Sequence, residues 1–371
     1  WQYRMRINVI SNTNLTDYQI LITLNPKIFN YSKADADGSD IRFTLYNSSD
    51  NSEELLSYWI EKWNTSGESR IWVKVSKIPT SENVTLYMYY GNASASSMAD
   101  GDATFEFFDD FEDNDISDWY QYGNGNILVA NDGGNMVLLK TAYNDPNGGY
   151  SLFNNGPISN FEAIFKTKRI NENGGRQNRY GIENGSFNGY GVRMQRFDGT
   201  ARTFAIEKRE NGIGTTIAST TFIGYSNTWY VIKFRKYGSN LEFELYDLSG
   251  NLIQSLVATN GSYNSFDRFV IHGGYEFYTD DIIVRKYVNP EPIVNMGEEQ
   301  SQQTWIDYFG GNASIETLTN ASIDYGDVKP NLTSSTNKYD FSSGAGVDKW
   351  AYRYQINSRP PATNNVPSVE L

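Results

Sequence analysis

The sequence has 371 residues, of which 39% are hydrophobic and 15% are aromatic, and this content of core-forming side chains excludes a disordered chain. Its 31 basic and 44 acidic side chains give a net charge of −13, and no run of Lys and Arg is present, which argues against nucleic acid or an anionic membrane as a partner. The lack of cysteine excludes disulfides, thiol catalysis and Cys-based metal centres. No stretch approaches the roughly 18 consecutive apolar residues of a membrane span, so no membrane insertion is expected in the visible chain.

The residue pattern predicts an all-β protein. Aromatic and β-branched residues are mixed with 32 Gly and with many Asn, Asp and Ser, which form turns. Residues 1–10 alternate, with apolar side chains from Trp1 to Val9 on one face and polar ones on the other, as in a half-buried strand that starts at the first residue. The same period of two recurs at 17–24, 40–47, 69–78 and 83–92. Regular spacing of short strands is typical of sandwiches, and we predict tandem β-sandwich domains of the jelly-roll type.

The first part of the chain also carries a family resemblance. Seven sequence segments follow one another over residues 1–107: W-x-Y-R, DYQILITL, DGSDIRFTLYN, LSYWIEKWN, RIWVKVSKIP, LYMYYGNASA and ATFEFFDDFE. Together they resemble an uncharacterised family of archaeal and bacterial surface proteins, a domain of unknown function. The resemblance implies an extracellular β-domain in front of other modules, and it brings no activity with it.

A second resemblance covers the middle of the chain. FFDDFEDNDISDWYQYGN and TDDIIVRKYVNPEP resemble the opening and closing strands of a concanavalin-like or laminin-G-like jelly roll, so a second domain is expected over 108–298. Strands are expected inside it at 160–170, 189–197, 203–210, 229–238 and 240–256, the last containing a hairpin turn at Asp247 to Asn251.

The last part of the chain is expected to be less regular. Two prolines and a polar run predict a linker near 289–303, and 299–371 is expected to hold a linker, a small β-element and a Pro-rich tail.

Acidic residues at the two ends of the predicted jelly roll are candidate metal ligands. The start and end of such a domain lie side by side, and calcium takes several hard oxygen ligands. The candidates are Asp110, Glu112, Asp113, Asp280 and Asp281. The resemblance to carbohydrate-binding jelly rolls implies Glu112 and Asp281 as the best ligands of a structural calcium, and the alternative is a set of solvated turn carboxylates. No organic cofactor is expected.

No arrangement of residues points to catalysis. The single histidine, His272, has no Ser or Asp placed to complete a triad, and one His without Cys cannot form the usual zinc centres. A glycosidase needs two nearby carboxylates, and the nearest approach is Glu242-x-Glu244. The plainer interpretation is that these two face solvent while Phe243 and Leu245 are buried. We therefore expect a protein that is not an enzyme.

Sugar binding would need exposed aromatic rings near turns. Trp119, Tyr120, Tyr122, Tyr180 and Tyr190 are candidates, although most aromatic residues must belong to the core.

Sequons for N-glycosylation are dense at both ends of the chain. They begin at Asn14, Asn30, Asn47, Asn64, Asn83, Asn92, Asn184, Asn260, Asn312, Asn320 and Asn331. Glycans at these positions would lie on exposed turns of a secreted protein.

Two functions from different classes follow. The first is a structural subunit of an extracellular filament, sheath or surface layer, which would form a homo-oligomer or polymer by strand addition through the strand at residue 1 or the Pro-rich C-terminal tail. The alternative is a carbohydrate-binding cell-surface adhesin with glycans as partners. A secreted glycosidase is the third and least favoured.

Overall fold

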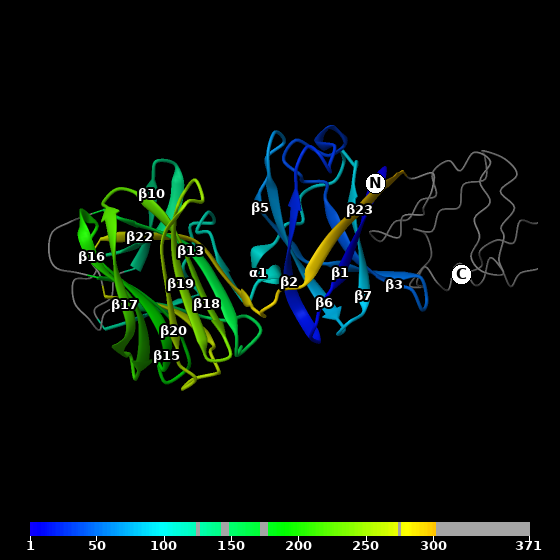
Figure 1. The fold of residues 1–371 in the computed structure, drawn as a ribbon. Coiled ribbons are helices and arrows are strands. Elements are labelled where there is room, and N and C mark those ends of the chain that lie inside the picture. Colours follow the sequence, from blue (N-terminus) through cyan, green and yellow to red (C-terminus); the bar gives the residue numbers. More distant parts are fainter. Residues whose placement is uncertain (124–126, 142–147, 171–176, 274–275, 302–371) are drawn as a thin grey trace, which may run out of the picture.

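The computed structural model describes residues 1–123, 127–141, 148–170, 177–273 and 276–301. Over these residues the protein is all-β and consists of two β-sandwiches side by side, as predicted (Figure 1). The helical elements are one turn at Tyr31–Lys33 (η1) and one at Gly101–Thr104 (α1), the latter at the junction of the sandwiches. Among the described residues, no helix has the length and apolar character needed to cross a bilayer.

The first sandwich packs a five-stranded sheet, in the order β23-β1-β7-β3-β4, against a three-stranded sheet, β2-β6-β5. The alternation expected in the first strand is confirmed, because Met5, Ile7 and Val9 are buried in one core with Ile20 and Ile22 of β2. The strands are β1 (Tyr3–Ile10), β2 (Leu15–Leu24), β3 (Arg42–Asn47), β4 (Ser52–Leu56), β5 (Tyr58–Lys62), β6 (Ser69–Ile78), β7 (Asn83–Tyr90) and β23 (Ile293–Ser301).

Strand β23 corrects the expectation of a linker near 289–303. After the second sandwich the chain returns to the first and pairs antiparallel with β1, from Ile10 opposite Ile293 to Tyr3 opposite Ser301. The second sandwich is therefore inserted between two strands of the first. Strand β1 is flanked on its other side by β7, so both of its edges are hydrogen-bonded within the chain. The predicted β-element and Pro-rich tail beyond residue 301 lie outside the described residues.

The second sandwich packs an eight-stranded sheet against a seven-stranded one. The first has the order β10-β11-β22-β13-β18-β19-β20, with β8 also paired to β22, and the second has the order β17-β16-β15-β14-β21-β12-β9. The strands are β8 (Phe107–Asp109), β9 (Trp119–Tyr122), β10 (Ile127–Asp132), β11 (Asn135–Lys140), β12 (Gly148–Leu152), β13 (Phe161–Arg169), β14 (Gln177–Glu183), β15 (Gly189–Gln195), β16 (Asp198–Glu210), β17 (Ile213–Tyr225), β18 (Trp229–Tyr237), β19 (Asn240–Asp247), β20 (Leu252–Thr259), β21 (Arg268–Gly273) and β22 (Phe277–Lys286).

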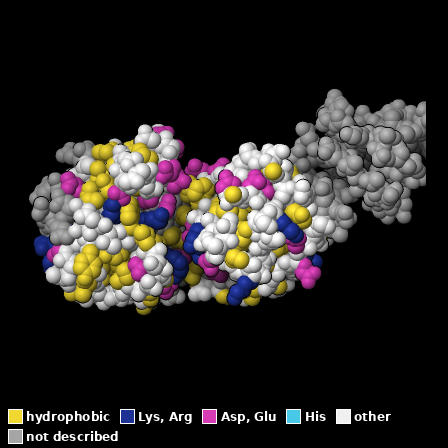
Figure 2. All heavy atoms as spheres, turned by 90° about the horizontal axis from the view of Figure 1, so that it is seen from above, with side chains coloured by type: hydrophobic (Ala, Val, Ile, Leu, Met, Phe, Trp, Pro, Cys, Tyr) yellow, Lys and Arg dark blue, Asp and Glu magenta, His cyan; other side chains and the backbone are white. Residues whose placement is uncertain are grey.

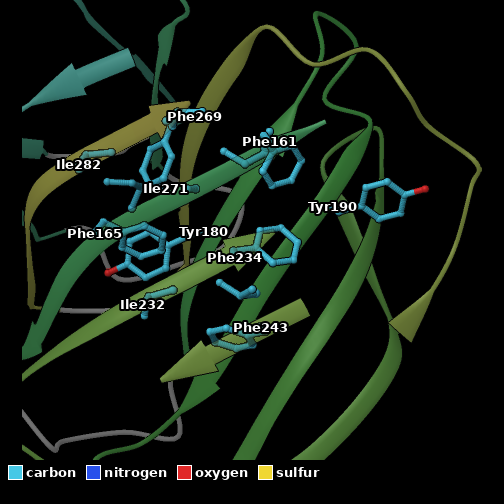
Figure 3. Packing of buried hydrophobic residues seen from close by; sticks show 14 of the residues in the cluster. Phe161, Phe165, Tyr180, Tyr190, Ile232, Phe234, Phe243, Phe269, Ile271 and Ile282 are labelled. Carbon is cyan, nitrogen blue, oxygen red and sulfur yellow. The ribbon is translucent and has the colours of Figure 1, made fainter. Parts of the chain in front are cut away.

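Aromatic rings fill the space between these two sheets (Figure 3). Phe165 from one sheet and Tyr180 from the other have ring centroids 4.4 Å apart, and Phe204 and Phe243 stack at 3.8 Å. Because each ring removes a large apolar area from water, this core fixes the position of the seven-stranded sheet.

A smaller apolar cluster joins the two sandwiches. Trp72 of the first sandwich and Ile164 and Ile283 of the second are buried together around Phe105. Polar contacts support it, since Gln19 donates from Nε2 to the Thr104 carbonyl (2.9 Å). Figure 2 shows the two lobes meeting at a narrow junction with charged side chains beside it. The junction is thus packed and hydrogen-bonded.

Candidate functional site

The outer face of the seven-stranded sheet, the face turned away from the core, carries an unusual set of side chains. On β14, Tyr180 and Ile182 enter the core, so Arg179, Gly181 and Glu183 must lie on the outer face. The register of β15, β16 and β21 brings further polar residues to this face beside them. These are Arg193, Glu207, Arg209 and His272.

These side chains form one chain of contacts, here called the buried network. The Tyr122 hydroxyl lies 2.6 Å from His272 Nδ1, and His272 Nε2 lies 2.7 Å from Glu183 Oε1. The same Glu183 oxygen lies 2.6 Å from Arg209 Nε, and Arg209 Nη1 lies 3.4 Å from Glu207 Oε2. His272, Glu183, Arg209 and Glu207 are each at most 2% exposed. A histidine that donates from Nε2 to Glu183 can accept a hydrogen bond from the Tyr122 hydroxyl at Nδ1.

Two further arginines surround Glu207. Arg193 donates from Nε to Glu207 Oε1 (2.6 Å) and from Nη2 to Thr216 Oγ1 (2.9 Å), while Arg179 Nε lies 3.6 Å from Glu207 Oε2. Among the described residues, Arg179, Arg193 and Arg209 thus lie beside the carboxylates of Glu183 and Glu207.

Glycines lie directly beneath the carboxylates of the network. A β-carbon at Gly181 would lie 2.2 Å from Glu183 Oε1, and one at Gly214 would lie 2.3 Å from Glu207 Oε2. Both distances are shorter than any real contact of a β-carbon, so a side chain at either position would displace the carboxylates. The glycines allow the charged groups to lie flat across the sheet.

One oxygen of the network has no partner within the described ranges. Glu183 Oε2 is buried and accepts no hydrogen bond there. Burial of several charges costs more free energy than burial of apolar side chains of the same volume, and an unsatisfied carboxylate oxygen adds to that cost. The network is therefore a poor device for stability alone.

Aromatic rings continue the outer face towards strand β9. Tyr120 and Tyr150 lie opposite each other on β9 and β12 and stack at 5.1 Å with an interplanar angle of 16°, and this pair is here called the tyrosine ledge. Tyr120 is 52% exposed. Tyr122 and Phe187 border Tyr150, at 6.4 Å and 5.5 Å between ring centroids.

Arg268 of β21 completes the ledge. Its guanidinium carbon lies 4.7 Å from the Tyr150 ring centroid and 5.2 Å from that of Phe187. Its Nε donates to Asp267 Oδ1 at 2.7 Å. The guanidinium is thereby held in one orientation against two half-buried rings, and Arg268 itself is only 8% exposed.

A tight turn between β14 and β15 brings Phe187 into place. Asn184 Oδ1 accepts from the amides of Ser186 and Asn188, and the Phe187 amide donates to the Asn184 carbonyl. Phe187 has φ of +56°, which is rare for a bulky residue. Backbone strain of this kind persists where the surrounding contacts fix it, often at binding sites.

The structure separates the aromatic residues that were expected to bind sugar. Tyr120 and Tyr122 lie at the outer face, whereas Trp119, Tyr180 and Tyr190 belong to the core. Sequence reasoning missed Tyr150, Arg268 and the buried network. One signal was present, since the glycines of RYGIE and NGYGV alternate with core residues and so mark a strand face over which other groups lie closely.

The residues considered for catalysis are all engaged in contacts. His272 lies in the buried network, as described above. Glu242 and Glu244 lie on one face of β19, both accept from Arg235 Nη1 (2.9 and 2.8 Å), and Phe243 and Leu245 between them are fully buried. The expected burial of Phe243 and Leu245 is therefore confirmed, whereas the two glutamates pair with Arg235 and Glu244 is only 14% exposed.

The candidate calcium ligands are partly drawn into other contacts. Asp281 forms an ion pair with Lys166, Glu112 Oε1 accepts from the Met136 amide, and Asp280 Oδ2 accepts from Asn135. Asp110 and Asp113 line an acidic pocket of about 230 Å³. No group of three or more His, Asp or Glu side chains suited to a metal is found within the described ranges. Calcium binding here stays a prediction.

Desolvation changes the protonation of nearby acids. Burial raises the pKa of Asp280 to about 6, and Asp281 acts in the same direction because a second negative charge disfavours ionisation. Burial likewise raises the pKa of Asp109 to about 7, in the same pocket as Asp110.

The described sequons lie at turns and strand ends. In six of them the asparagine Oδ1 accepts a hydrogen bond from the backbone amide two residues further on, which is the geometry of an Asx turn. These are Asn30, Asn47, Asn64, Asn92, Asn184 and Asn260. Asn14 and Asn83 are exposed, and Asn312, Asn320 and Asn331 lie outside the described residues. Glycosylation stays a prediction at all of these positions.

Comparison with known families supports the first resemblance in part. The model of a domain of unknown function, DUF2341, matches residues 37–123. Two uncharacterised proteins of Methanocaldococcus jannaschii, MJ1394 and MJ1472, are each 31% identical, over 228 and 160 residues. These matches cover 59% and 38% of this chain but only 21% and 29% of the relatives, so the chain corresponds to a minor part of each.

Solved structures similar to this chain match about half of it. A carbohydrate-binding module, CBM66 of Bacillus subtilis, is 14% identical and covers 46% of this chain and 97% of its own, with a TM-score of 0.35. The CBM2 module of an evolved Dit protein of Lactobacillus casei phage J-1 is 9% identical (48% and 94% covered, TM-score 0.39), and peanut lectin is 9% identical (51% and 97%, 0.35). At these identities and scores the matches identify no ligand.

Proposed function

We propose that the outer face of the seven-stranded sheet binds a carbohydrate without cleaving it. The observation that carries this proposal is the tyrosine ledge, a stacked pair of rings in which Tyr150 is half-buried and Tyr120 is 52% exposed. Sugar rings present apolar C–H faces and polar edges, so they are recognised by aromatic surfaces with hydrogen-bonding groups beside them. Among the hypotheses from the sequence, this function agrees best with the geometry.

A binding role fits the carboxylates better than a catalytic one. Glu183 and Glu207 both contact Arg209, so neither is free to face a scissile bond as acid, base or nucleophile. Outside the outer face, Glu242 and Glu244 share Arg235.

The structural-subunit hypothesis loses one of its two motives. It relied on a strand at residue 1 and a Pro-rich C-terminal tail that could add to a neighbouring copy, but β1 pairs with β7 and β23 of its own chain. The tail lies outside the described residues. A secreted, cell-surface location remains part of the proposal, and mass spectrometry of native material for N-glycans tests it.

A glycan array probed with the full chain tests the binding function. We expect discrete glycans to bind, and Tyr120→Ala to weaken them by ~10-fold, equivalent to ~1.4 kcal/mol. Tyr225→Ala is the matched control, because Tyr225 is 58% exposed at the opposite edge of the same sheet. Equal loss in both variants, or an array without binding, contradicts the proposal.

A further inference from the structure

A cleft of about 340 Å³ lies where the two sandwiches meet, on the outer face of the eight-stranded sheet. Its walls include Arg70 and Trp72 of β6 in the first sandwich and Ile164, Lys233 and Arg235 in the second. Clefts between domains are common ligand sites. We infer that this cleft binds a small organic acid with one carboxylate and an apolar body, and that Lys233 is the counter-ion of the carboxylate. This site is separate from the proposed sugar site, which belongs to the other sheet.

Lys233 is a half-buried cation without an anionic partner. It lies opposite Glu244 of β19, but Glu244 Oε2 accepts from Arg235 Nη1 at 2.8 Å. Its cross-strand neighbour on β13 is the apolar Ile164. In the part of the chain that the structure describes, the carboxylates of this face pair with other cations, and Lys233 Nζ lies 5.2 Å from the ring centroid of Tyr246. A ligand carboxylate would supply the missing partner.

The surroundings of Lys233 disfavour its charged form. Burial lowers the pKa of its ammonium group. The negative charges of Glu162 and Glu244 oppose this effect, but the guanidinium groups of Arg235 and Arg70 add to it, and the pKa stays below the ordinary lysine value of 10.5. A carboxylate bound here raises that pKa again, so binding favours the protonated lysine.

The arginines of the cleft are already paired, which limits the ligand to a single negative charge. Arg70 donates from Nε to Glu61 Oε1 at 3.0 Å. Arg235 and Arg285 share Glu162, to which their Nε atoms donate at 2.6 and 2.7 Å. A doubly charged anion such as sulfate would meet these carboxylates without a second free cation to balance it. A monocarboxylate balances the unpaired lysine alone.

Apolar side chains form much of the remaining wall. Leu21, Tyr287 and Val294 line the cleft and are half-buried, so part of their surface is open to a ligand. Trp72 is 2% exposed and lies 4.7 Å from the guanidinium carbon of Arg285, which fixes that side of the cleft. Each apolar group of a ligand that these side chains cover adds to its affinity. A larger acid should therefore bind more tightly than acetate.

Titration of the full chain with small acids, followed by ligand-observed NMR, tests this site. The probes are phenylacetate, hexanoate and cyclohexanecarboxylate, each beside its uncharged amide, and acetate as a charged probe without an apolar body. At about pH 7 and low salt, at least one acid should bind ~10-fold more tightly than its amide and than acetate. Lys233→Met should abolish the preference for acid over amide. Lys77→Met is the matched control, because Lys77 is exposed at the far end of the strand that carries Arg70, and it should keep the preference.

Two further measurements keep the result interpretable. If thermal melts show that Lys233→Met does not fold, the pH profile of the wild type takes its place: acid affinity should fall as the pH rises towards 10.5, and amide affinity should not. Tyr120→Ala should leave acid binding unchanged, since Tyr120 lies on the other sheet.

Three results overturn the inference: no binding of any probe, equal affinity of acid and amide in every pair, or a preference that folded Lys233→Met retains. None of them bears on the proposed sugar site. Conversely, a glycan array without binding beside retained acid binding overturns the proposed function alone.

Discussion

The two sandwiches bury charged groups in different ways. In the first, Asp40 and Arg42 are at most 3% exposed, and backbone groups supply most of their partners. The Asp40 carboxylate accepts from three amides, and Arg42 donates to carbonyls of nearby loops. In the second, Glu183 and Arg209 contact other ionisable side chains across neighbouring strands. Charges of the first kind hold loops, and charges of the second kind join strands of one sheet.

The largest effect is expected where one charge of the buried network is removed. Arg209→Met leaves Glu183 and Glu207 buried without their shared partner, and it should lower the free energy of unfolding in urea by about 3–5 kcal/mol. The double variant Glu183→Gln, Arg209→Met removes one charge of each sign and leaves Glu207 paired with Arg193, so it should recover much of this loss. If Arg209→Met lowers the free energy of unfolding by less than about 1 kcal/mol, the ion pairs of the second sandwich are no more costly to break than exposed ones, and the difference proposed between the two sandwiches is wrong.

A smaller loss is expected in the first sandwich. Asp40→Ala leaves the amides of Asp35, Gly91 and Asn92 without an acceptor, which should cost about 3 kcal/mol in the same assay. Asp37→Ala in the same loop is the control, since Asp37 is exposed and accepts from Ser39 alone. Sugar binding should remain at the wild-type level in both variants. A loss of binding in Asp40→Ala without unfolding would show that the first sandwich contributes to the site.

The next effect depends on pH and concerns Asp280 of the second sandwich. Because the pKa of Asp280 is raised from 3.8 to about 6 in the folded protein, its stabilising contribution is complete below about pH 4 and is lost as the pH rises through 6. The free energy of unfolding should therefore fall over this window by up to about 3 kcal/mol from this group. Asp280→Asn should flatten that part of the curve, measured in EDTA.

Adding calcium to the same unfolding assay tests whether Asp280 is a metal ligand. If the ion binds Asp280 and Asp281, adding about 5 mM calcium at pH 8 should stabilise the wild type by ~1 kcal/mol for an affinity near 1 mM, and should not stabilise Asp280→Asn. Equal stabilisation of both proteins would remove these two residues from the candidate set.

Much of the fold followed from local patterns, and much of the site did not. Strands such as β1, β6 and β18 alternate apolar and polar residues, so their positions could be predicted from the sequence. Strand β23 alternates weakly because it is a mostly exposed edge strand, and its partner β1 lies nearly the whole described chain away. The tyrosine ledge depends in the same way on pairing between β9 and β12, and the buried network on four strands whose order no local pattern reveals.

The return of the chain through β23 gives the second sandwich two covalent attachments to the first, one before β8 and one after β22. A module on a single tether rotates about it and loses that freedom each time it meets a large target. Here the two chain connections, and the apolar cluster around Trp72 and Phe105 between them, restrict rotation of one sandwich relative to the other. Several such molecules aligned on one support would all point their tyrosine ledges the same way, so a long polysaccharide could engage many of them at once without further ordering.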